Sequence, residues 1–335
     1  MREYLHFLQD NHPWLLRVVA FYMGACVGSF LNVCILRIPA GKSIVTPRSH
    51  CACGQPIAWY DNIPILSWFI LRGKARCCGR KFSIRYSIIE AATAGAFLWL
   101  WMTLPPAPAV AGMAFFALLL LGAMIDLDHM ELPDLTTIGG MFVGVLLSCL
   151  WPQIHRVAPT PELWLLANLH AGVLAMVGAV VGAGVVFWIR ELGEVMFRKE
   201  AMGYGDVLLM GCIGAFCGWR GAIFSMFGGA MIGLVVILPW MAFAWALRKP
   251  GQEPATPTAS AAKTSAEEKA NENVAASESV PEHADAPAFG VAIPFGPWLS
   301  LAGFLYYAWP LLHNGVDRYF DMLTALALGE MPTNG

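Results

Sequence analysis

Residues 200–216 read "EAMGYGDVLLMGCIGAF", in which an aspartate stands at the start of an apolar run. Asp206 follows Gly203 and Gly205, and the run from Val207 to Trp219 holds 13 residues without Asp, Glu, Lys or Arg. A helix needs about 20 residues to cross a bilayer, so this run predicts a short span or a segment that enters below the membrane surface. Carboxylates embedded in membranes often mark functional sites.

The composition indicates an integral membrane protein. The 335-residue chain is 57% hydrophobic and 13% charged, with a mean hydropathy of +0.58, whereas a soluble domain is about 25% charged. The net charge of −2 gives no reason to expect a nucleic-acid partner. The first residues lack the pattern of a cleaved signal peptide, so we expect the first apolar segment to stay in the mature protein.

Long apolar stretches predict an all-α polytopic membrane protein with about eight transmembrane helices. The stretches are continuously apolar rather than alternating, which argues against barrel strands. Residues 91–125 have room for two short passes, broken near Pro105, Pro106 and Pro108. The other expected spans lie within residues 18–36, 135–154, 163–189, 207–219, 221–247 and 286–316.

Lys and Arg predict the orientation of these spans. With eight spans, one side of the membrane receives the connections 37–90, 126–134, 190–206 and 248–289. They carry nine, zero, three and four Lys or Arg, which is 16 of the 21 in the chain. Since basic connections face the cytoplasm, we expect both termini outside.

The spans and connections predict six segments. They are a first transmembrane helix (14–37), a cytoplasmic loop domain (38–86), a transmembrane core (87–247), a cytoplasmic linker (248–289), a last transmembrane helix (290–316) and a C-terminal tail (317–335). Residues 249–288 contain no aromatic residue, Leu or Ile. Such a segment buries too little apolar surface to offset its ordering entropy, so we expect the linker to be disordered.

Four of the nine cysteines fall in the loop domain, as Cys51, Cys53, Cys77 and Cys78. Two cysteine pairs about 25 residues apart are typical of a four-thiolate zinc site, which would stabilise so small a domain. The spacing is irregular, because the pairs are CxC and CC rather than CxxC. The alternative is a degenerate loop with free or partly oxidised thiols.

A second acidic stretch, "IDLDHMELPD" from Ile125 to Asp134, lies between two expected spans. Its carboxylates and Asp206 are expected at the same membrane face. Two carboxylates held close together do not both ionise easily, so one serves as general base and the other as general acid. The glycines before Asp206 would let the backbone approach an extended substrate closely. The alternatives are solvated turn residues and helix caps, or a proton-coupled transport path.

The motifs together resemble the bacterial type IV prepilin peptidases (prepilin leader peptidase/N-methyltransferases) of the GxGD membrane aspartyl protease class. The resemblance covers residues 28–296 except the linker. The stretches that carry it are "GSFLNVCILRIP" (Gly28–Pro39), "NIPILSW" (Asn62–Trp68), "SIRYSIIE" (Ser83–Glu90), "IDLDHMELPD" (Ile125–Asp134), "EAMGYGD" (Glu200–Asp206) and "IPFGPWL" (Ile293–Leu299).

This resemblance implies that Asp126 and Asp206 are the catalytic aspartates, with Asp128 and Asp134 as runners-up for the first. It implies removal of a basic leader from type IV prepilins or type II secretion pseudopilins, after a glycine at the cytoplasmic face of the bacterial inner membrane. It also implies methylation of the new N-terminus with S-adenosylmethionine. We expect Asp128, Glu131 and Asp134 to offer an acidic surface to the leader.

The sequence departs from the family pattern at two places. The shortened cysteine spacing puts zinc binding, and with it the methyltransferase-associated loop, in question. Leu208 stands where the family commonly has a lysine. Arg85 and Glu90 match family positions, and we expect them to form an ion pair where the loop meets the membrane. A proton-coupled transporter, a peptidase without methyltransferase activity and a non-enzymatic assembly factor remain the alternatives.

Overall fold

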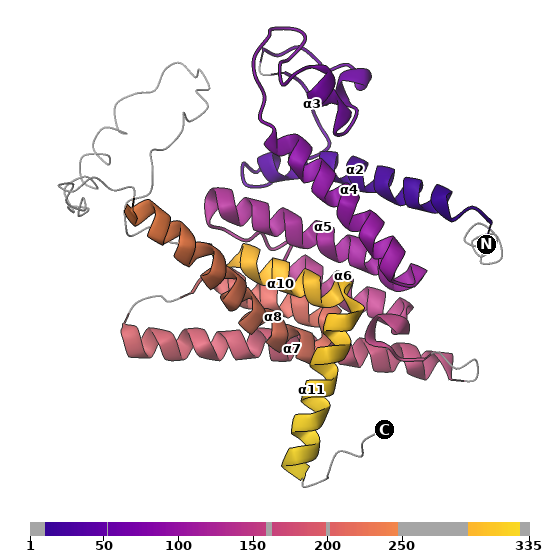
Figure 1. Ribbon diagram of the computed structural model, residues 1–335, viewed down its shortest axis with the longest axis vertical. Coiled ribbons are helices and arrows are strands. Elements are labelled where there is room, and N and C mark those ends of the chain that lie inside the picture. Colours follow the sequence, from indigo (N-terminus) through magenta and orange to yellow (C-terminus); the bar gives the residue numbers. More distant parts are fainter. Residues whose placement is uncertain (1–10, 52, 159–162, 199–201, 247–293, 329–335) are drawn as a thin grey trace. The chain divides into compact units, whose positions relative to one another are not determined.

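The computed structural model describes residues 11–51, 53–158, 163–198, 202–246 and 294–328. Over these residues the chain forms helices joined by loops (Figure 1). Two isolated β-bridges lie in the loop between α2 and α4. The chain divides into two units, one running to Leu234 and resuming at Pro294, the other from Val235 to Ile293. The second unit is described only over residues 235–246, which end helix α8. The predicted linker 248–289 lies outside the described residues.

Helices occupy the positions at which spans are expected (Figure 1). They are α2 (Pro13–Arg37), α4 (Arg85–Thr103), α5 (Pro106–His129), α6 (Ile138–Leu150), α7 (Trp164–Phe197), α8 (Tyr204–Ala246) and α10 (Gly296–Ala308). Among the described residues, α2, α5, α7 and α8 are long and apolar enough to cross a membrane, and α6 is a shorter apolar helix. The all-helical, polytopic fold class is therefore confirmed.

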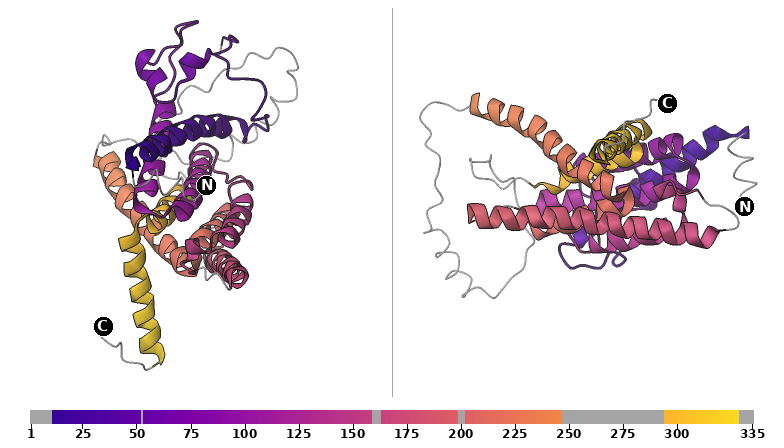
Figure 2. Two further views of the ribbon diagram at one scale, coloured as in Figure 1. Left: turned by 90° about the vertical axis from the view of Figure 1, so that its right-hand side faces the viewer. Right: turned by 90° about the horizontal axis from the view of Figure 1, so that it is seen from below.

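Helix α8 is interrupted at Gly218, whose backbone is not helical (φ 69°, ψ 176°). Glycine tolerates a positive φ without steric cost, so the break falls at this residue. The first helical segment of α8 therefore covers residues 204–217 and is about 20 Å long, shorter than the hydrocarbon core of about 30 Å, and Trp219 lies beyond the break. Helix α7, by contrast, continues for 34 residues as one straight helix (Figure 2).

The end of the chain differs from the expected last transmembrane helix at 290–316. Helix α10 ends at Ala308, Trp309 is extended, and α11 (Pro310–Leu328) begins at a proline. The expected C-terminal tail, 317–335, therefore begins inside α11. The cause is Pro310, which lacks the N–H that would continue α10 and is well suited to the first turn of a new helix.

Two glycines bring α2 and α4 into close contact. A Cβ added to Gly24 would lie 2.7 Å from the Cα of Ala94, and one added to Gly28 would lie 2.7 Å from the Cα of Glu90. Small residues at this spacing let membrane helices approach closely. Asn32, one turn further along α2, donates a hydrogen bond to the C=O of Tyr86 at 3.0 Å. Helix α2 is thus fixed along α4.

The packed core joins α5, the first segment of α8 and α10. Phe115 stacks on Phe216 with ring centroids 4.5 Å apart, and the Tyr307 ring lies 5.5 Å from Phe115. The Tyr307 hydroxyl donates to the C=O of Pro108 at 2.8 Å. These contacts hold the three helices whose ends carry the acidic site.

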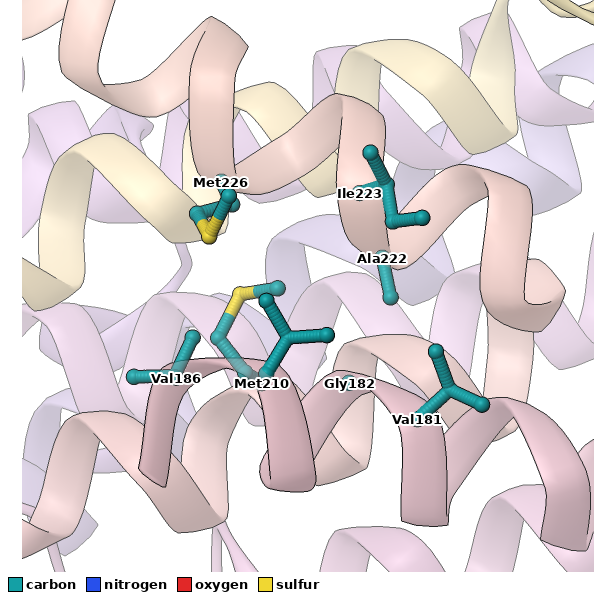
Figure 3. Close-up of a pocket in the computed structure, with 8 residues that line it drawn as sticks. Val181, Gly182, Val186, Met210, Ala222, Ile223 and Met226 are labelled. Carbon is teal, nitrogen blue, oxygen red and sulfur yellow. The ribbon is translucent and has the colours of Figure 1, made fainter. Parts of the chain in front are cut away.

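A small pocket between α7 and α8 has an entirely apolar lining (Figure 3). Val181 and Val186 come from α7, Met210 from the first segment of α8, and Ala222 and Met226 from the second. It offers no polar group to orient a ligand, so it is a packing feature of the helix interface rather than a candidate site.

Candidate active site and metal centre

Asp126 lies near the end of α5, where an apolar helix meets a polar loop. Asp126 is only 6% exposed, although the helix ends three residues later at His129. The next residue, Met130, adopts a left-handed conformation (φ 58°) and donates its N–H to the C=O of Asp126 at 2.9 Å. This bond closes the last turn and fixes the backbone of Asp126.

Asp206 lies in the first turn of α8 and is 9% exposed. Its N–H donates to the C=O of Gly203 at 3.2 Å. The carboxyl groups of Asp126 and Asp206 are near enough to interact electrostatically. The structure therefore brings together the two acidic stretches that are separated by 80 residues in the sequence.

The start of α10 contributes to the same place. The backbone N–H of Gly296 interacts with the Asp126 carboxylate, while Oδ2 of Asp126 is buried without a hydrogen-bond partner of ordinary geometry among the described residues. A Cβ added to Gly296 would lie 2.6 Å from that Oδ2. A side chain here would displace the carboxylate or α10, so the "IPFGPWL" motif acquires a role at the aspartate pair.

Leu132 packs between the segments that carry the two aspartates. A Cβ on Gly205 would lie 2.9 Å from the Cβ of Leu132, and one on Gly296 would lie 3.6 Å from its Cδ1. Gly203, in contrast, has nothing within 4 Å of an added Cβ. The two glycines of the motif therefore differ: Gly205 is required by packing, whereas Gly203 leaves open space.

Asp128 is held by a basic side chain from the loop boundary. The Arg85 guanidinium donates from NH1 to Oδ1 at 2.8 Å and from NH2 to Oδ2 at 2.6 Å. The expected ion pair between Arg85 and Glu90 is thus replaced by one with Asp128. Glu90 instead accepts the backbone N–H of Ile65 at 2.7 Å, because Ile65 turns with a positive φ of 66° just before a short helix.

Glu131 and Asp134 remain at the surface of the loop after α5. The backbone of Asp134 lies in the turn before α6, and its C=O accepts the N–H of Gly139 at 2.9 Å. Neither carboxylate joins the buried pair. Leu208, at the position where a lysine is common, is half-buried in α8.

The four loop cysteines form one cluster. Their Sγ atoms all lie within 4.8 Å of one another. The Sγ atoms of Cys51 and Cys78 are 3.5 Å apart, and those of Cys53 and Cys77 are 3.4 Å apart. Each close pair joins one cysteine of the CxC sequence to one of the CC sequence. All four cysteines are free thiols.

Two similar turns present these cysteines despite the irregular spacing. One turn is closed by a β-bridge between His50 and Pro56, the other by a bridge between Lys74 and Lys81. Gly54 and Gly79 follow the cysteine pairs with positive φ values of 85° and 69°. Both cysteine pairs are therefore followed by a glycine turn, and the two turns fold the pairs toward each other despite the shortened spacing.

The chemistry of the cluster fits a cation. The hydrogen bond from the Cys53 backbone, with those from Cys77 and Cys78, lowers the pKa of Cys51 to about 7. Hydrogen bonds to Cys53 and Cys51 raise the pKa of Cys77 to about 12. Four thiolates this close repel one another, so they need a shared positive charge to ionise together, and four sulfur donors are a set that zinc prefers. The cluster is compatible with zinc.

Sequence reasoning missed three residues of this site. Gly296 was visible only as part of a motif, Leu132 is an apolar residue in an acidic loop, and Arg85 was assigned the wrong partner. The signals were a Gly-Pro pair at the start of a helix and an Arg at a loop boundary. Neither signal says which distant residue it meets.

Two families match the chain in succession. The Bacterial Peptidase A24 N-terminal domain matches residues 22–104, and the Type IV leader peptidase family matches residues 113–238. The first therefore covers α2, the loop and α4, and the second covers both aspartates. No solved structure matches the chain.

Full-length relatives are similar as well. A Prepilin leader peptidase/N-methyltransferase from Myxococcus xanthus is 32% identical, over 95% of this chain and 96% of the relative. An enzyme of the same name from Klebsiella pneumoniae is 35% identical, over 63% of this chain and 89% of the relative. A type 4 prepilin-like proteins leader peptide-processing enzyme from Escherichia coli is 35% identical, over 62% and 80%.

Proposed function

Because the chain belongs to the type IV leader peptidase family, we propose that it is a membrane aspartic endopeptidase that processes prepilins or pseudopilins. It removes a basic leader after a glycine and then methylates the new N-terminus with S-adenosylmethionine. The observation that carries the peptidase proposal is the pair of buried, interacting carboxyl groups of Asp126 and Asp206. The methyltransferase proposal rests on the names of the relatives.

Asp126 and Asp206 share the proton transfers of peptide hydrolysis in this proposal. One carboxylate takes a proton from a water molecule, whose oxygen attacks the scissile carbonyl carbon. The other carboxyl group donates its proton as the C–N bond breaks and the amine leaves. The buried Oδ2 of Asp126 that lacks a partner supports this role, because such groups in native structures are often catalytic.

The substrate approaches from the side of Gly203, where an added Cβ meets nothing within 4 Å. Open backbone lets an extended chain come close to Asp206. The exposed Glu131 and Asp134 offer negative charge to a basic leader. Asp128 contributes less to that surface, since Arg85 already balances its charge.

We place the enzyme in the bacterial inner membrane with the aspartates at the cytoplasmic face. The basic connection 37–90 supports this orientation. The functional segments are the first helix (14–37), the loop domain (38–86) and the aspartyl protease core (87–247). A prepilin, as a single apolar helix, reaches the site by lateral diffusion and presents its leader junction at the interface.

Zinc, held by Cys51, Cys53, Cys77 and Cys78, would supply a structural cross-link for the loop domain. A closed site of four thiolates has no open position for a substrate, so its contribution is stability rather than catalysis. The irregular CxC and CC spacing is accommodated by the two turns described above.

The test is incubation of the purified full chain in detergent with a prepilin and, separately, with a pseudopilin. Mass spectrometry reads leader loss and methyl addition as two separate mass changes, with and without S-adenosylmethionine. Leader loss alone would mark a peptidase without methyltransferase activity. Absence of leader loss with both substrates would contradict the proposed function.

A further inference from the structure

We propose that Arg85 is a positioning residue for Asp126 and acts by clamping Asp128. The two hydrogen bonds of 2.8 and 2.6 Å form a bidentate, charge-assisted pair, which is stronger and more directional than a single contact. The inference rests on the proposed peptidase function.

The backbone around Arg85 is anchored, so the residue is able to hold another. Arg85 begins α4, and its N–H donates to the Ser83 hydroxyl at 3.2 Å. The C=O of the next residue, Tyr86, accepts the side-chain amide of Asn32 from α2 at 3.0 Å. One turn further, Glu90 binds the Ile65 backbone. The guanidinium therefore extends from a point fixed by α2 and the loop domain.

Asp128 is the point at which this anchor reaches the catalytic helix. It lies two residues after Asp126, which is about 200° around a helix, so the two side chains leave α5 on opposite faces. The helix ends at His129, and the N–H of Met130 closes its last turn on the C=O of Asp126. Helix ends fray, and the clamp on Asp128 holds the turn that carries Asp126.

This geometry gives Asp128 a role different from binding the leader. Its carboxylate is occupied at both oxygens by Arg85. A basic leader would have to displace the guanidinium to reach it. Loss of the clamp should therefore lower the rate of the chemical step rather than weaken substrate binding.

The experiment measures kcat and KM of the full chain in detergent with charge-reversed variants. Arg85→Asp, Asp128→Arg and the double variant are compared on two prepilins, one with its natural basic leader and one with the leader Lys and Arg changed to Gln. We expect each single variant to lose about 10-fold or more in kcat on both substrates, a change of about 1.4 kcal/mol in the barrier. The double variant should regain most of the loss, because the reversed pair restores the clamp.

Milder variants keep the test decisive if charge reversal prevents folding. Arg85→Lys keeps the charge but not the bidentate geometry, so its kcat should lie between those of the unaltered chain and Asp128→Asn. Asp321→Asn is the matched control, since it removes a carboxylate that binds Arg220 in another ion pair. The control should keep its kcat, and thermal unfolding in detergent confirms that each variant is folded.

Two results would overturn the inference. If the single variants raise KM only, and only for the natural leader, Asp128 contacts the substrate directly. If the double variant is no better than the poorer single variant, the pair does not position the helix. An unaltered chain that fails to cleave speaks against the proposed function, whereas a cleaving chain with unchanged kcat in the variants speaks against Arg85 alone.

Discussion

Asp126 and Asp206 stand 80 residues apart in the chain, yet their buried carboxyl groups interact electrostatically. One ends a long apolar helix and the other begins a broken one, so the pair exists only where α5 and α8 meet. The N–H of Gly296, at the start of a third helix, interacts with the first of them. Three helix ends thus define the site.

Replacing either aspartate by asparagine should slow leader cleavage severely. Asparagine keeps the volume but neither takes nor gives a proton as a carboxyl group does, so we expect a loss of about 100-fold to 10,000-fold in kcat for Asp126→Asn and Asp206→Asn. Mass spectrometry of a prepilin after timed incubation with each variant measures the rate of leader loss. Cleavage by either variant at the rate of the unaltered chain, in protein that stays folded in the membrane, would rule that residue out as catalytic.

Adding one methyl group at Gly296 should impair the reaction. The new Cβ would lie 2.6 Å from Oδ2 of Asp126, which forces the carboxylate or α10 to move. Moving a catalytic group by about 1 Å costs up to about 100-fold in rate. We therefore expect kcat for Gly296→Ala to fall by about 10-fold to 100-fold. Gly184→Ala is the matched control, because an added Cβ there meets nothing within 4 Å. Equal activity of the two variants would show that Gly296 has no special role.

The loop domain should contain about one zinc ion per chain, bound by four cysteines. Elemental analysis of the purified protein measures it. Cys51→Ser and Cys78→Ser should lose the metal and make residues 38–86 more sensitive to limited proteolysis, because metal binding supplies much of the stability of so small a domain. Cys26 is an exposed cysteine of α2, so Cys26→Ser should change neither the zinc content nor the sensitivity to proteolysis. Metal content that survives loss of Cys51 would contradict the site.

His155 should make the protein less stable in acid. Burial lowers the pKa of this imidazole to about 4, where its Nε2 lies 3.0 Å from the Ser148 hydroxyl and 3.2 Å from the C=O of Ala215. Between about pH 6.5 and 4 the unfolded chain binds a proton that the folded chain does not. The free energy of unfolding therefore falls as the pH drops through this window, by up to about 3 kcal/mol.

Unfolding in detergent from pH 7.5 to pH 4 tests this prediction on the full chain. His155→Gln keeps a side-chain amide for the two hydrogen bonds and should flatten the pH dependence. His170→Gln, at an exposed histidine of α7, controls for the loss of one histidine. An unchanged slope in His155→Gln would show that other groups carry the acid sensitivity.

Much of the helical layout was predictable because lipid leaves a chain few choices. Continuous apolar runs must form helices when backbone groups find no water, and prolines mark their boundaries, as Pro106 does at the start of α5. The same reasoning missed the break at Pro310. The four cysteines and both aspartates were visible as residue types, since few other side chains perform their chemistry.

The partners of these residues were not predictable. Arg85 was expected to pair with Glu90, five residues away, and pairs with Asp128 instead, 43 residues away. Gly203 and Gly205 look alike in the motif, but only Gly205 faces another side chain closely. Pairings of this kind depend on how the helices pack, and a local sequence pattern does not reveal that packing.

The sequence by itself determined that the chain is a helical membrane protein, which residues carry its acidic and thiol chemistry, and which family those motifs resemble. Composition and the length of the apolar runs suffice for the first of these, because they set the transfer free energy of each segment into lipid, whereas the family follows from the resemblance of the motifs. Only the tertiary structure decided that α10 delivers Gly296 to Asp126, that Leu132 fills the space beneath Gly205, and that the irregular cysteine pairs still converge. These outcomes depend on distances between segments remote in the chain, which are fixed by packing and not by the properties of any one segment.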